Sequence, residues 1–128
     1  MKKLIDSNIF IDALRGHPLA ISYISSHPPE SLSCSAVTVA ELWSGVREGC
    51  ETLVATMLSK IQILSVDESI AKQAGWYMNQ FKKSHNLIMA DALIAATAKS
   101  IDIPLVTRNI RHFPMKDIRI EVPYKLNS

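Results

Sequence analysis

The stretch that decides the fold lies at the start of the chain and reads Lys3-Leu4-Ile5-Asp6-Ser7-Asn8-Ile9-Phe10-Ile11. Residues 3–6 form a short apolar run that ends on an acid, as a buried strand does, and residues 7–14 continue as a helix. The same change from strand to helix recurs along the chain. The sequence predicts strands at residues 3–6, 31–36, 62–66, 104–107 and 118–122. It predicts helices at residues 7–14, 20–26, 38–48, 51–60, 67–83 and 87–100.

Strands that alternate with helices indicate an α/β fold, because parallel neighbours need a crossover connection. We therefore expect a three-layer α/β/α sandwich around a central, mostly parallel sheet of about five strands. The 128 residues suit one domain over residues 1–128, and a hydrophobic content of 48% with 20% charged residues argues against disorder. Ligands of such sheets bind outside the carboxyl ends of the strands. Residues that directly follow strands are therefore the first candidates for a site.

Composition excludes several classes of protein. No apolar run reaches the roughly 18 residues of a membrane span, and Asp6 interrupts the start before a signal peptide could develop. The cysteines, Cys34 and Cys50, form no CxxC motif and the four histidines lack metal-binding spacing, so we expect neither a disulfide framework nor a zinc site. A reducing cytoplasm is the expected location. The net charge is only +2, but residues 108–128 carry five basic and two acidic residues, so the basic excess lies in the tail.

Two acids lie where a solvated carboxylate is not expected. Asp6 ends an apolar strand at the carboxyl edge of the predicted sheet, and a role as helix N-cap is the alternative explanation. The helical neighbours of Asp91 at three and four positions are all apolar: Leu87, Ile88, Ile94 and Ala95. A carboxylate there is costly to ionise unless a cation or several donors meet it. A first-turn acid favoured by the helix dipole is the alternative explanation for Asp91.

Glu41 is ambiguous from the sequence. With Thr38 it matches a capping box, in which the glutamate bonds back to the start of its helix. It also lies opposite the apolar stripe of this helix and so faces either solvent or a polar cleft. If Glu41 converges with Asp6 and Asp91, the three carboxylates form an oxygen-rich site that selects Mg²⁺ or Mn²⁺ over zinc. Such a site suits phosphodiester hydrolysis, because a bound metal generates hydroxide and stabilises developing charge.

Other chemistries lack their motifs. The chain has no GxSxG elbow, no GxxxxGK[ST] loop and no GxGxxG loop. An Asp-dependent phosphoacceptor or phosphatase needs a second acid close to the first, and residues 6–8 do not supply one. Trp76 and Tyr77 are candidates for base stacking or a protein interface, whereas core packing is expected for Trp43. Nine acids are expected to be solvated: Asp12, Glu30, Glu48, Glu51, Asp67, Glu68, Asp102, Asp117 and Glu121.

Four segments together resemble the ordered motifs of the PIN-domain family. They are Leu4-Ile5-Asp6-Ser7-Asn8-Ile9, Ser35-Ala36-Val37-Thr38-Val39-Ala40-Glu41-Leu42, Met89-Ala90-Asp91-Ala92-Leu93-Ile94-Ala95-Ala96-Thr97-Ala98 and Pro104-Leu105-Val106-Thr107-Arg108-Asn109-Ile110-Arg111-His112-Phe113. The segments lie within residues 3–113, and the length and the alternation of strands and helices also agree. Within the family, the chain most resembles the VapC-type toxins of VapBC toxin–antitoxin systems. The resemblance thus implies a PIN-like α/β fold.

The resemblance also implies roles for particular residues. It places metal-binding, catalytic acids at Asp6, Glu41 and Asp91. It adds Asn109 to the catalytic set, at a position where many relatives carry aspartate and others of this toxin group carry asparagine. An amide leaves the site one negative charge short, which favours hydrolysis with one metal over a tightly held second metal. The supporting residues are Ser7, Asn8 and Thr107, and the expected RNA contacts are Arg108 and Arg111.

The activity implied by the resemblance is that of a Mg²⁺-dependent endoribonuclease toxin, with Mn²⁺ as a substitute. Such relatives cleave structured or messenger RNA, often a tRNA, and so inhibit translation. They form homodimers and bind a VapB-type antitoxin, whose C-terminal segment packs into a groove and often delivers a basic side chain to the acids. The alternative is a catalytically weak PIN-like scaffold that binds RNA or a protein. The retained acids argue against that alternative.

Overall fold

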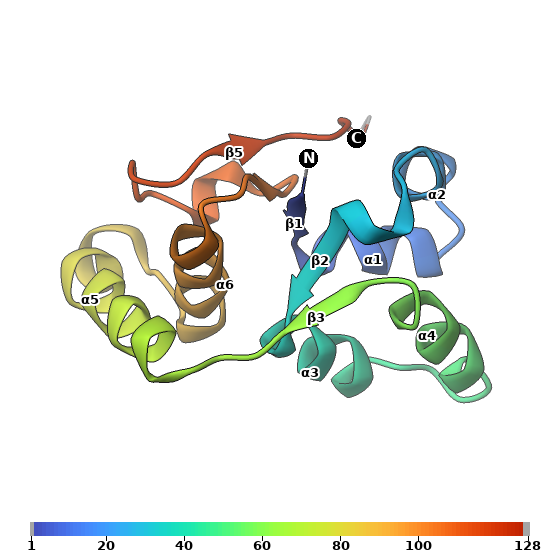
Figure 1. Ribbon diagram of the computed structural model, residues 1–128, viewed down its shortest axis with the longest axis horizontal. Helices are drawn as coiled ribbons and strands as arrows, with labels where there is room; N and C mark the ends of the chain where they lie inside the picture. Colours follow the sequence, from blue (N-terminus) through green and yellow to red (C-terminus); the bar gives the residue numbers. More distant parts are fainter. Residues whose placement is uncertain (1, 127–128) are drawn as a thin grey trace.

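The computed structural model describes residues 2–126 and contains a five-stranded sheet in which every strand runs parallel to its neighbours (Figure 1). The strands are β1 (Lys3–Ile5), β2 (Leu32–Ser35), β3 (Gln62–Leu64), β4 (Leu105–Val106) and β5 (Ile120–Glu121). The helices are α1 (Ser7–Leu14), α2 (Pro18–Ser25), α3 (Ala36–Ser44), α4 (Glu51–Leu58), α5 (Glu68–His85) and α6 (Met89–Ile101), with short 3-10 turns at η1 (Pro29–Ser31) and η2 (Ile110–His112). The predicted α/β fold is confirmed, and each strand is shorter than predicted.

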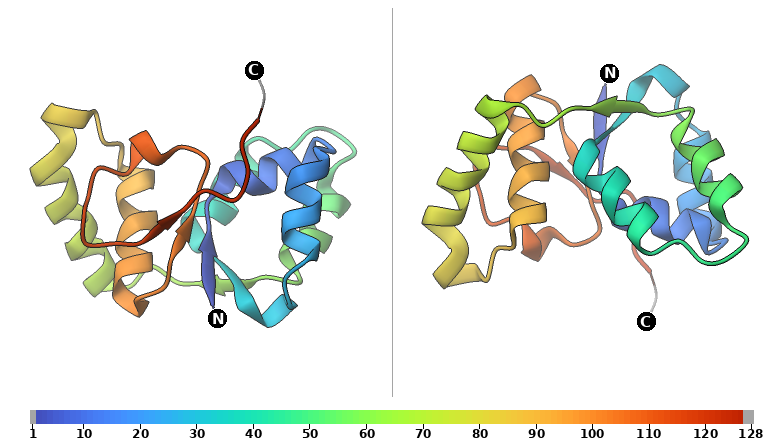
Figure 2. Two further views of the ribbon diagram at one scale, coloured as in Figure 1. Left: turned by 90° about the horizontal axis from the view of Figure 1, so that it is seen from above. Right: turned by 90° about the horizontal axis from the view of Figure 1, so that it is seen from below.

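The sheet separates two apolar cores, because successive side chains of a strand point to opposite faces. Leu4 and Leu105 pack with α5 and α6 on one face. Ile5 and Val106 pack with α1 and α4 on the other. Figures 1 and 2 show the α5–α6 pair on one side of the sheet and the α1–α4 group on the other. No helix within the described residues 2–126 is both long and apolar enough to cross a membrane.

The chain starts in the centre of the sheet and extends it in both directions. The strand order β3-β2-β1-β4-β5 shows that β2 and β3 are added on one side of β1, and β4 and β5 on the other. The direction of growth therefore reverses between β1 and β4, where Leu4 pairs with Leu105 and Ile5 with Val106. In open parallel sheets, the carboxyl ends of the strands form a crevice at such a reversal. Asp6 and Thr107, which follow β1 and β4, lie at this crevice.

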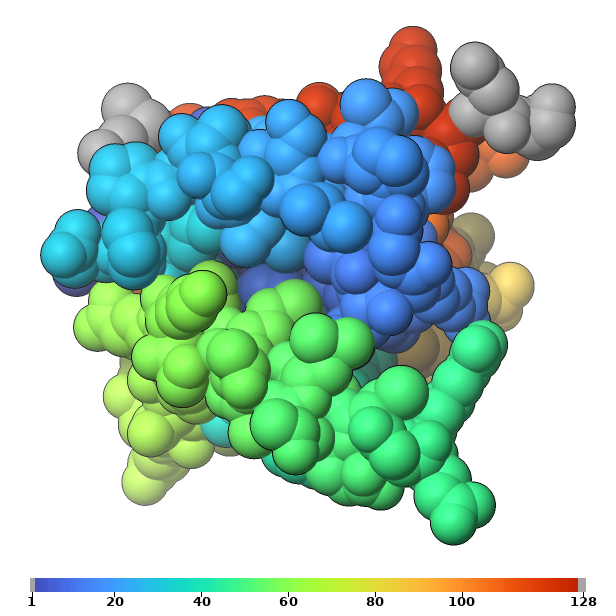
Figure 3. Space-filling view, turned by 90° about the vertical axis from the view of Figure 1, so that its right-hand side faces the viewer, coloured from blue at the N-terminus to red at the C-terminus, as the bar shows by residue number. Residues whose placement is uncertain are grey.

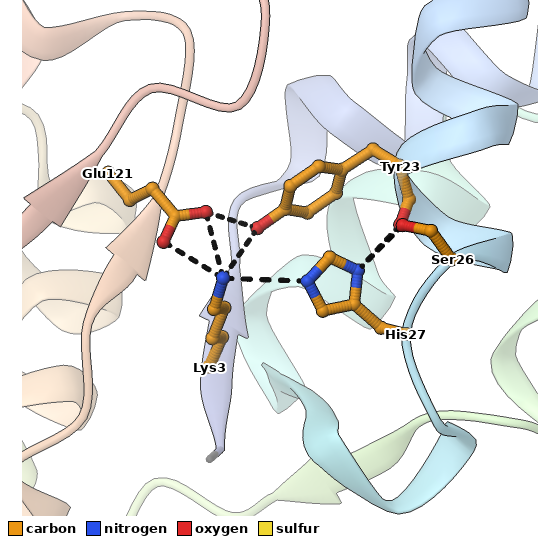
Figure 4. A network of polar contacts seen from close by, with 5 residues as sticks. All are labelled: Lys3, Tyr23, Ser26, His27 and Glu121. Atoms are coloured by element: carbon orange, nitrogen blue, oxygen red, sulfur yellow. Dashed lines mark hydrogen bonds and ion pairs between the residues drawn. The ribbon is translucent and has the colours of Figure 1, made fainter.

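A polar cluster holds the edge strand β5 against β1 and α2 (Figure 4). The ammonium of Lys3 lies 2.9 and 3.0 Å from the two carboxylate oxygens of Glu121, and the hydroxyl of Tyr23 donates to the same carboxylate. Lys3 also lies 3.4 Å from Nε2 of His27. Burial raises the pKa of Glu121, but the Tyr23 and Lys3 contacts outweigh it and hold the pKa below its usual value. The expectation that Glu121 is merely solvated is therefore wrong.

Candidate acidic site

Asp6 is a buried carboxylate at the crevice. Its side chain accepts hydrogen bonds from the backbone N–H of Ser7 at 2.8 Å and from the hydroxyl of Thr107 at 2.7 Å. Burial, which leaves Asp6 only 5% exposed, raises its pKa, and these donors oppose the rise only in part. Asp6 is also the N-cap of α1, so the capping explanation holds. Capping does not account for the raised pKa.

Thr107 connects Asp6 to the segment that follows β4. Its buried hydroxyl donates to Asp6 and accepts from the backbone N–H of Asn109 at 3.0 Å and from the side-chain amide of Asn8 at 3.3 Å. A hydroxyl has one proton and two lone pairs, so these three bonds use its full capacity. They place Asn8 and the backbone of Asn109 beside Asp6. The side chain of Asn109 makes none of these bonds.

Glu41 lies on α3, which begins at Ala36 rather than at residue 38. Ser35 caps this helix by accepting a hydrogen bond from the N–H of Val37 at 3.1 Å, so the predicted capping box of Thr38 and Glu41 is wrong. Burial raises the pKa of Glu41, the Ser7 hydroxyl opposes the rise, and the charge of Asp6 adds to it. The capping explanation for this carboxylate is thereby removed, and the side chains that act on its pKa are Ser7 and Asp6.

Asp91 lies in the first turn of α6, and its side chain is 13% exposed. Burial and the charge of Asp6 raise its pKa to about 6, Glu41 adds to the rise, and His112 opposes it. The ring nitrogen Nδ1 of His112 lies 3.5 Å from the carboxylate. Because the charges of Asp6 and Glu41 both raise the pKa of Asp91, the three carboxylates interact electrostatically across the end of β1, helix α3 and the first turn of α6.

The three carboxylates do not form a ready-made metal cage. Within residues 2–126, no group of three or more His, Cys, Asp or Glu side chains is placed to hold a metal ion. The site nevertheless fits a hard divalent cation. Its donors are all oxygens, and three buried side-chain oxygens of Asn8, Thr38 and Glu41 lack a hydrogen-bond partner in the described part of the chain. Like charges repel, so a divalent cation bound here would offset the mutual repulsion of Asp6, Glu41 and Asp91.

Two residues near the site were not indicated by the sequence. Asp12 was expected to be solvated but is buried, and it accepts hydrogen bonds from Arg108 at 2.6 and 3.1 Å and from the hydroxyl of Tyr124 at 2.7 Å. Two nitrogens of the Arg108 guanidinium are therefore already engaged. The signal for Asp12 was its position inside the apolar run 9–14, which resembles that of Asp6. No local pattern places His112 beside Asp91.

The exposed aromatic residues differ from the sequence-based expectation. Trp43 is 39% exposed, so the prediction of core packing is wrong. Tyr77 is buried and its hydroxyl donates to Asp117 at 2.7 Å, which excludes it as a base-stacking residue. Trp76 is 57% exposed. Two arginines of the basic tail are paired with acids: Arg108 contacts Asp12, and Arg119 contacts Asp102. The positive charge of the tail is therefore partly neutralised.

The sequence and the fold agree with one known family. The family model of the PIN domain matches residues 3–118. The chain belongs to the PIN-domain family. This PIN domain is 39% identical to Ribonuclease VapC10 of Mycobacterium tuberculosis over 114 residues, which cover 88% of the chain and 86% of the relative. It is 38% identical to Ribonuclease VapC19 of the same organism over 116 residues, or 88% and 93% of the two chains. A toxin–antitoxin complex from Klebsiella pneumoniae has a TM-score of 0.81 at 25% identity, over 98% of this chain and 100% of that one.

We expect Thr107→Val to disturb the site without changing the volume of the side chain. The substitution leaves the Asn109 N–H and the Asn8 amide without an acceptor, so the free energy of unfolding should fall by about 1–3 kcal/mol. It also removes a donor from Asp6, so the pKa of Asp6 should rise further. Urea denaturation and an NMR titration of the Asp6 carboxyl carbon measure the two effects. Thr107→Ser, which keeps the hydroxyl, is the control, and an unchanged Asp6 titration in the valine variant contradicts the prediction.

Proposed function

We propose that the chain is a Mg²⁺- or Mn²⁺-dependent endoribonuclease and the toxin of a toxin–antitoxin module, with residues 1–128 as one nuclease domain. The observation that carries the proposal is the buried Asp6 at the crevice between β1 and β4, whose charge raises the pKa of both Glu41 and Asp91. Its relatives are named ribonucleases, which supports RNA as the substrate. Cleavage of a tRNA or an mRNA, and the resulting inhibition of translation, belong to the same proposal.

Asp6, Glu41 and Asp91 are the residues that would hold the metal. When bound, the ion supplies an activated water and neutralises charge on the phosphate. The hydroxyl of Thr107 and the N–H of Ser7 orient the carboxylate of Asp6, so this ligand is in place before the ion arrives. Asn109 adds a neutral amide at most, which favours one tightly held ion over two.

The RNA contacts are proposed on the segment that follows β4. Arg111 is exposed on η2, and the half-buried Arg108 is held by Asp12, so the two arginines differ in mobility. Both lie close in sequence to Asn109, and phosphate contacts there would position a strand at the acids. Pairing of two copies of the chain, expected from the resemblance, stays a prediction that analytical ultracentrifugation can test.

We expect Asp91→Asn and Glu41→Gln each to abolish cleavage of single-stranded RNA in Mn²⁺. Loss of a metal ligand should lower the rate by more than the roughly 100-fold that loss of an outer-shell partner costs. The matched control is Asp102→Asn, which removes an exposed acid from the other end of α6 at a left-handed position that asparagine tolerates. RNA 5′ ends mapped by sequencing give the readout. Equal activity in Asp91→Asn contradicts the proposal, and a wild type that binds RNA without cutting it supports the scaffold alternative.

We expect the acidic site to destabilise the protein when no metal is present. The pKa of Asp91 is raised from 3.8 to about 6, so stability falls as the pH rises from about 4 to about 6. At neutral pH, Asp91→Asn should therefore raise the free energy of unfolding by about 1 kcal/mol, after allowance for solvent screening. Mg²⁺ should raise the melting temperature of the wild type but not of the variant. Differential scanning fluorimetry in EDTA and in Mg²⁺ measures both, and a wild type that does not respond to Mg²⁺ or Mn²⁺ contradicts a metal site.

We propose that a VapB-type antitoxin places an apolar segment in the groove between α1, α3 and α4. Figure 3 shows this side of the molecule, where the α1–α2 region lies against α4. The groove has a volume of about 190 Å³, and its apolar lining includes Ile11, Leu14, Leu42, Val46, Leu53 and Val54. Glu41 also lines it, so a segment in the groove lies beside the acidic site. The structural likeness to a toxin–antitoxin complex supports this partner.

We expect Leu53→Glu to weaken binding of the antitoxin, because it replaces an apolar side chain of the groove, on which an apolar segment would pack, with a charged one. Leu53 is exposed, so the substitution should not disturb the core. Ile63→Glu, at an exposed apolar residue of β3 that does not line the groove, is the control. Co-purification with the product of a short gene adjacent to this one measures binding. Equal loss of binding in both variants contradicts the assignment of the groove.

A further inference from the structure

We propose that a hollow between α5 and α6 is a second RNA-binding site, in which a base stacks on Trp76 and phosphates contact Lys72 and Lys99. The inference rests on the proposed function for the choice of RNA as the ligand. The hollow has a volume of about 740 Å³ and lies along the helix pair. Figures 1 and 2 show the two helices side by side at one end of the molecule.

Small residues keep the hollow open beside the indole of Trp76. Gly75 has no side chain, and a Cβ at this position would meet no atom within 4 Å. Ala96 of α6 is buried and fills little of the space. Trp76 also lines a second hollow of about 310 Å³, whose lining includes both Lys116 and Asp117. The indole, 57% exposed, therefore borders open space in two directions, as a stacking platform requires.

The polar lining favours RNA over an apolar protein segment. Lys72 and Lys99 both line the larger hollow, and no acidic side chain among the described residues lines it. Lys99 pairs with Asp117 at 3.3 Å, but both side chains are exposed, so the pair is weak and screened by salt. The remaining polar side chains are Ser69, Gln73, Asn79 and Ser100. Exposed indole, lysines and amides in one hollow match the way single strands are bound through bases and phosphates.

The acidic site and the hollow share helix α6. Asp91 lies in its first turn and Lys99 in its last, eight positions further along. This separation is about 12 Å along the helix axis, a length that about four stacked nucleotides cover. A strand longer than about four nucleotides is therefore needed to reach the acids while another part of it occupies the hollow. Such a site would raise the affinity for longer RNA without contact with the reacting phosphate.

Tryptophan fluorescence provides a direct test. The chain has two tryptophans, so Trp43→Phe leaves Trp76 as the sole reporter. We expect a short oligouridine RNA, titrated in EDTA so that no metal-dependent cleavage occurs, to quench this emission and to saturate. Trp76→Ala should weaken binding about 5- to 100-fold by anisotropy, and Trp76→Phe should restore much of the affinity. Because Trp76 is exposed, neither variant should impair folding.

The lysines are tested through the salt dependence of binding. We expect the double variant Lys72→Ala and Lys99→Ala to bind more weakly and with a smaller slope against salt concentration. The matched control, Lys82→Ala with Lys83→Ala, removes the same charge near the end of α5 and outside the hollow. The control should change affinity little. Equal effects of the two double variants overturn the proposal.

Three further outcomes separate the possibilities. RNA that binds by anisotropy but leaves the emission of Trp76 unchanged overturns the second site. A change of oligomeric state in Trp76→Ala, without a change in RNA affinity, also overturns it and assigns this face to an interface between copies. Loss of cleavage in Asp91→Asn with intact quenching of Trp76 supports both sites. Quenching of Trp76 by RNA in a wild type that never cuts RNA supports the hollow and overturns only the proposed nuclease activity.

Discussion

The hydrogen bond from Thr107 to Asp6 is the interaction on which the acidic site depends. It joins the residues that follow β1 and β4, the two strands between which the sheet reverses its direction of growth. Asp6 is nearly buried there, so it loses most of its hydration, and the Thr107 hydroxyl and the Ser7 N–H replace part of it. The same hydroxyl fixes the backbone of Asn109. The Thr107 hydroxyl thus adds a side-chain link between the first and fourth family motifs to the backbone pairing of β1 with β4.

The site places several carboxylates where their ionisation is unfavourable. Burial raises the pKa of Asp6, Glu41 and Asp91, and their charges act on one another. A buried, poorly paired charge destabilises a fold, and apolar residues at such positions are often as stable or more so. A cation that binds only the folded state offsets this cost by mass action. The contrast with Asp12 is informative, because Asp12 is also buried but has Arg108 and Tyr124 as full partners. The electrostatic cost is therefore concentrated at the crevice.

The order of strands and helices could be predicted because the spacing of apolar residues and the length of each segment distinguish a strand from a helix locally. The contexts of Asp6 and Asp91 were visible for the same reason, since an acid in an apolar run stands out. Glu41 could not be assigned locally, because Ser35 and Thr38 are both good caps and only the tertiary position of α3 selects Ser35. The partnership of Asp12 with Arg108 spans 96 positions and that of Tyr77 with Asp117 spans 40, so no local pattern could reveal either. Exposure of Trp43 likewise depends on what packs against α3, and an amphipathic stripe does not specify that.

An acidic pocket repels the polyanion it is proposed to cut, so attraction must come from surfaces outside the pocket. Helix α6 shows how one element can carry both an acid of the pocket and a basic residue outside it. Its dipole favours an acid in the first turn and a cation in the last, which is where Asp91 and Lys99 lie. The helix is buried along most of its length, with Ala92 and residues 94–98 in the core, so its two ends are held at a constant separation. Lys99, which is proposed to contact RNA, is thus kept about 12 Å from Asp91, which is proposed to bind a metal, and neither charge neutralises the other.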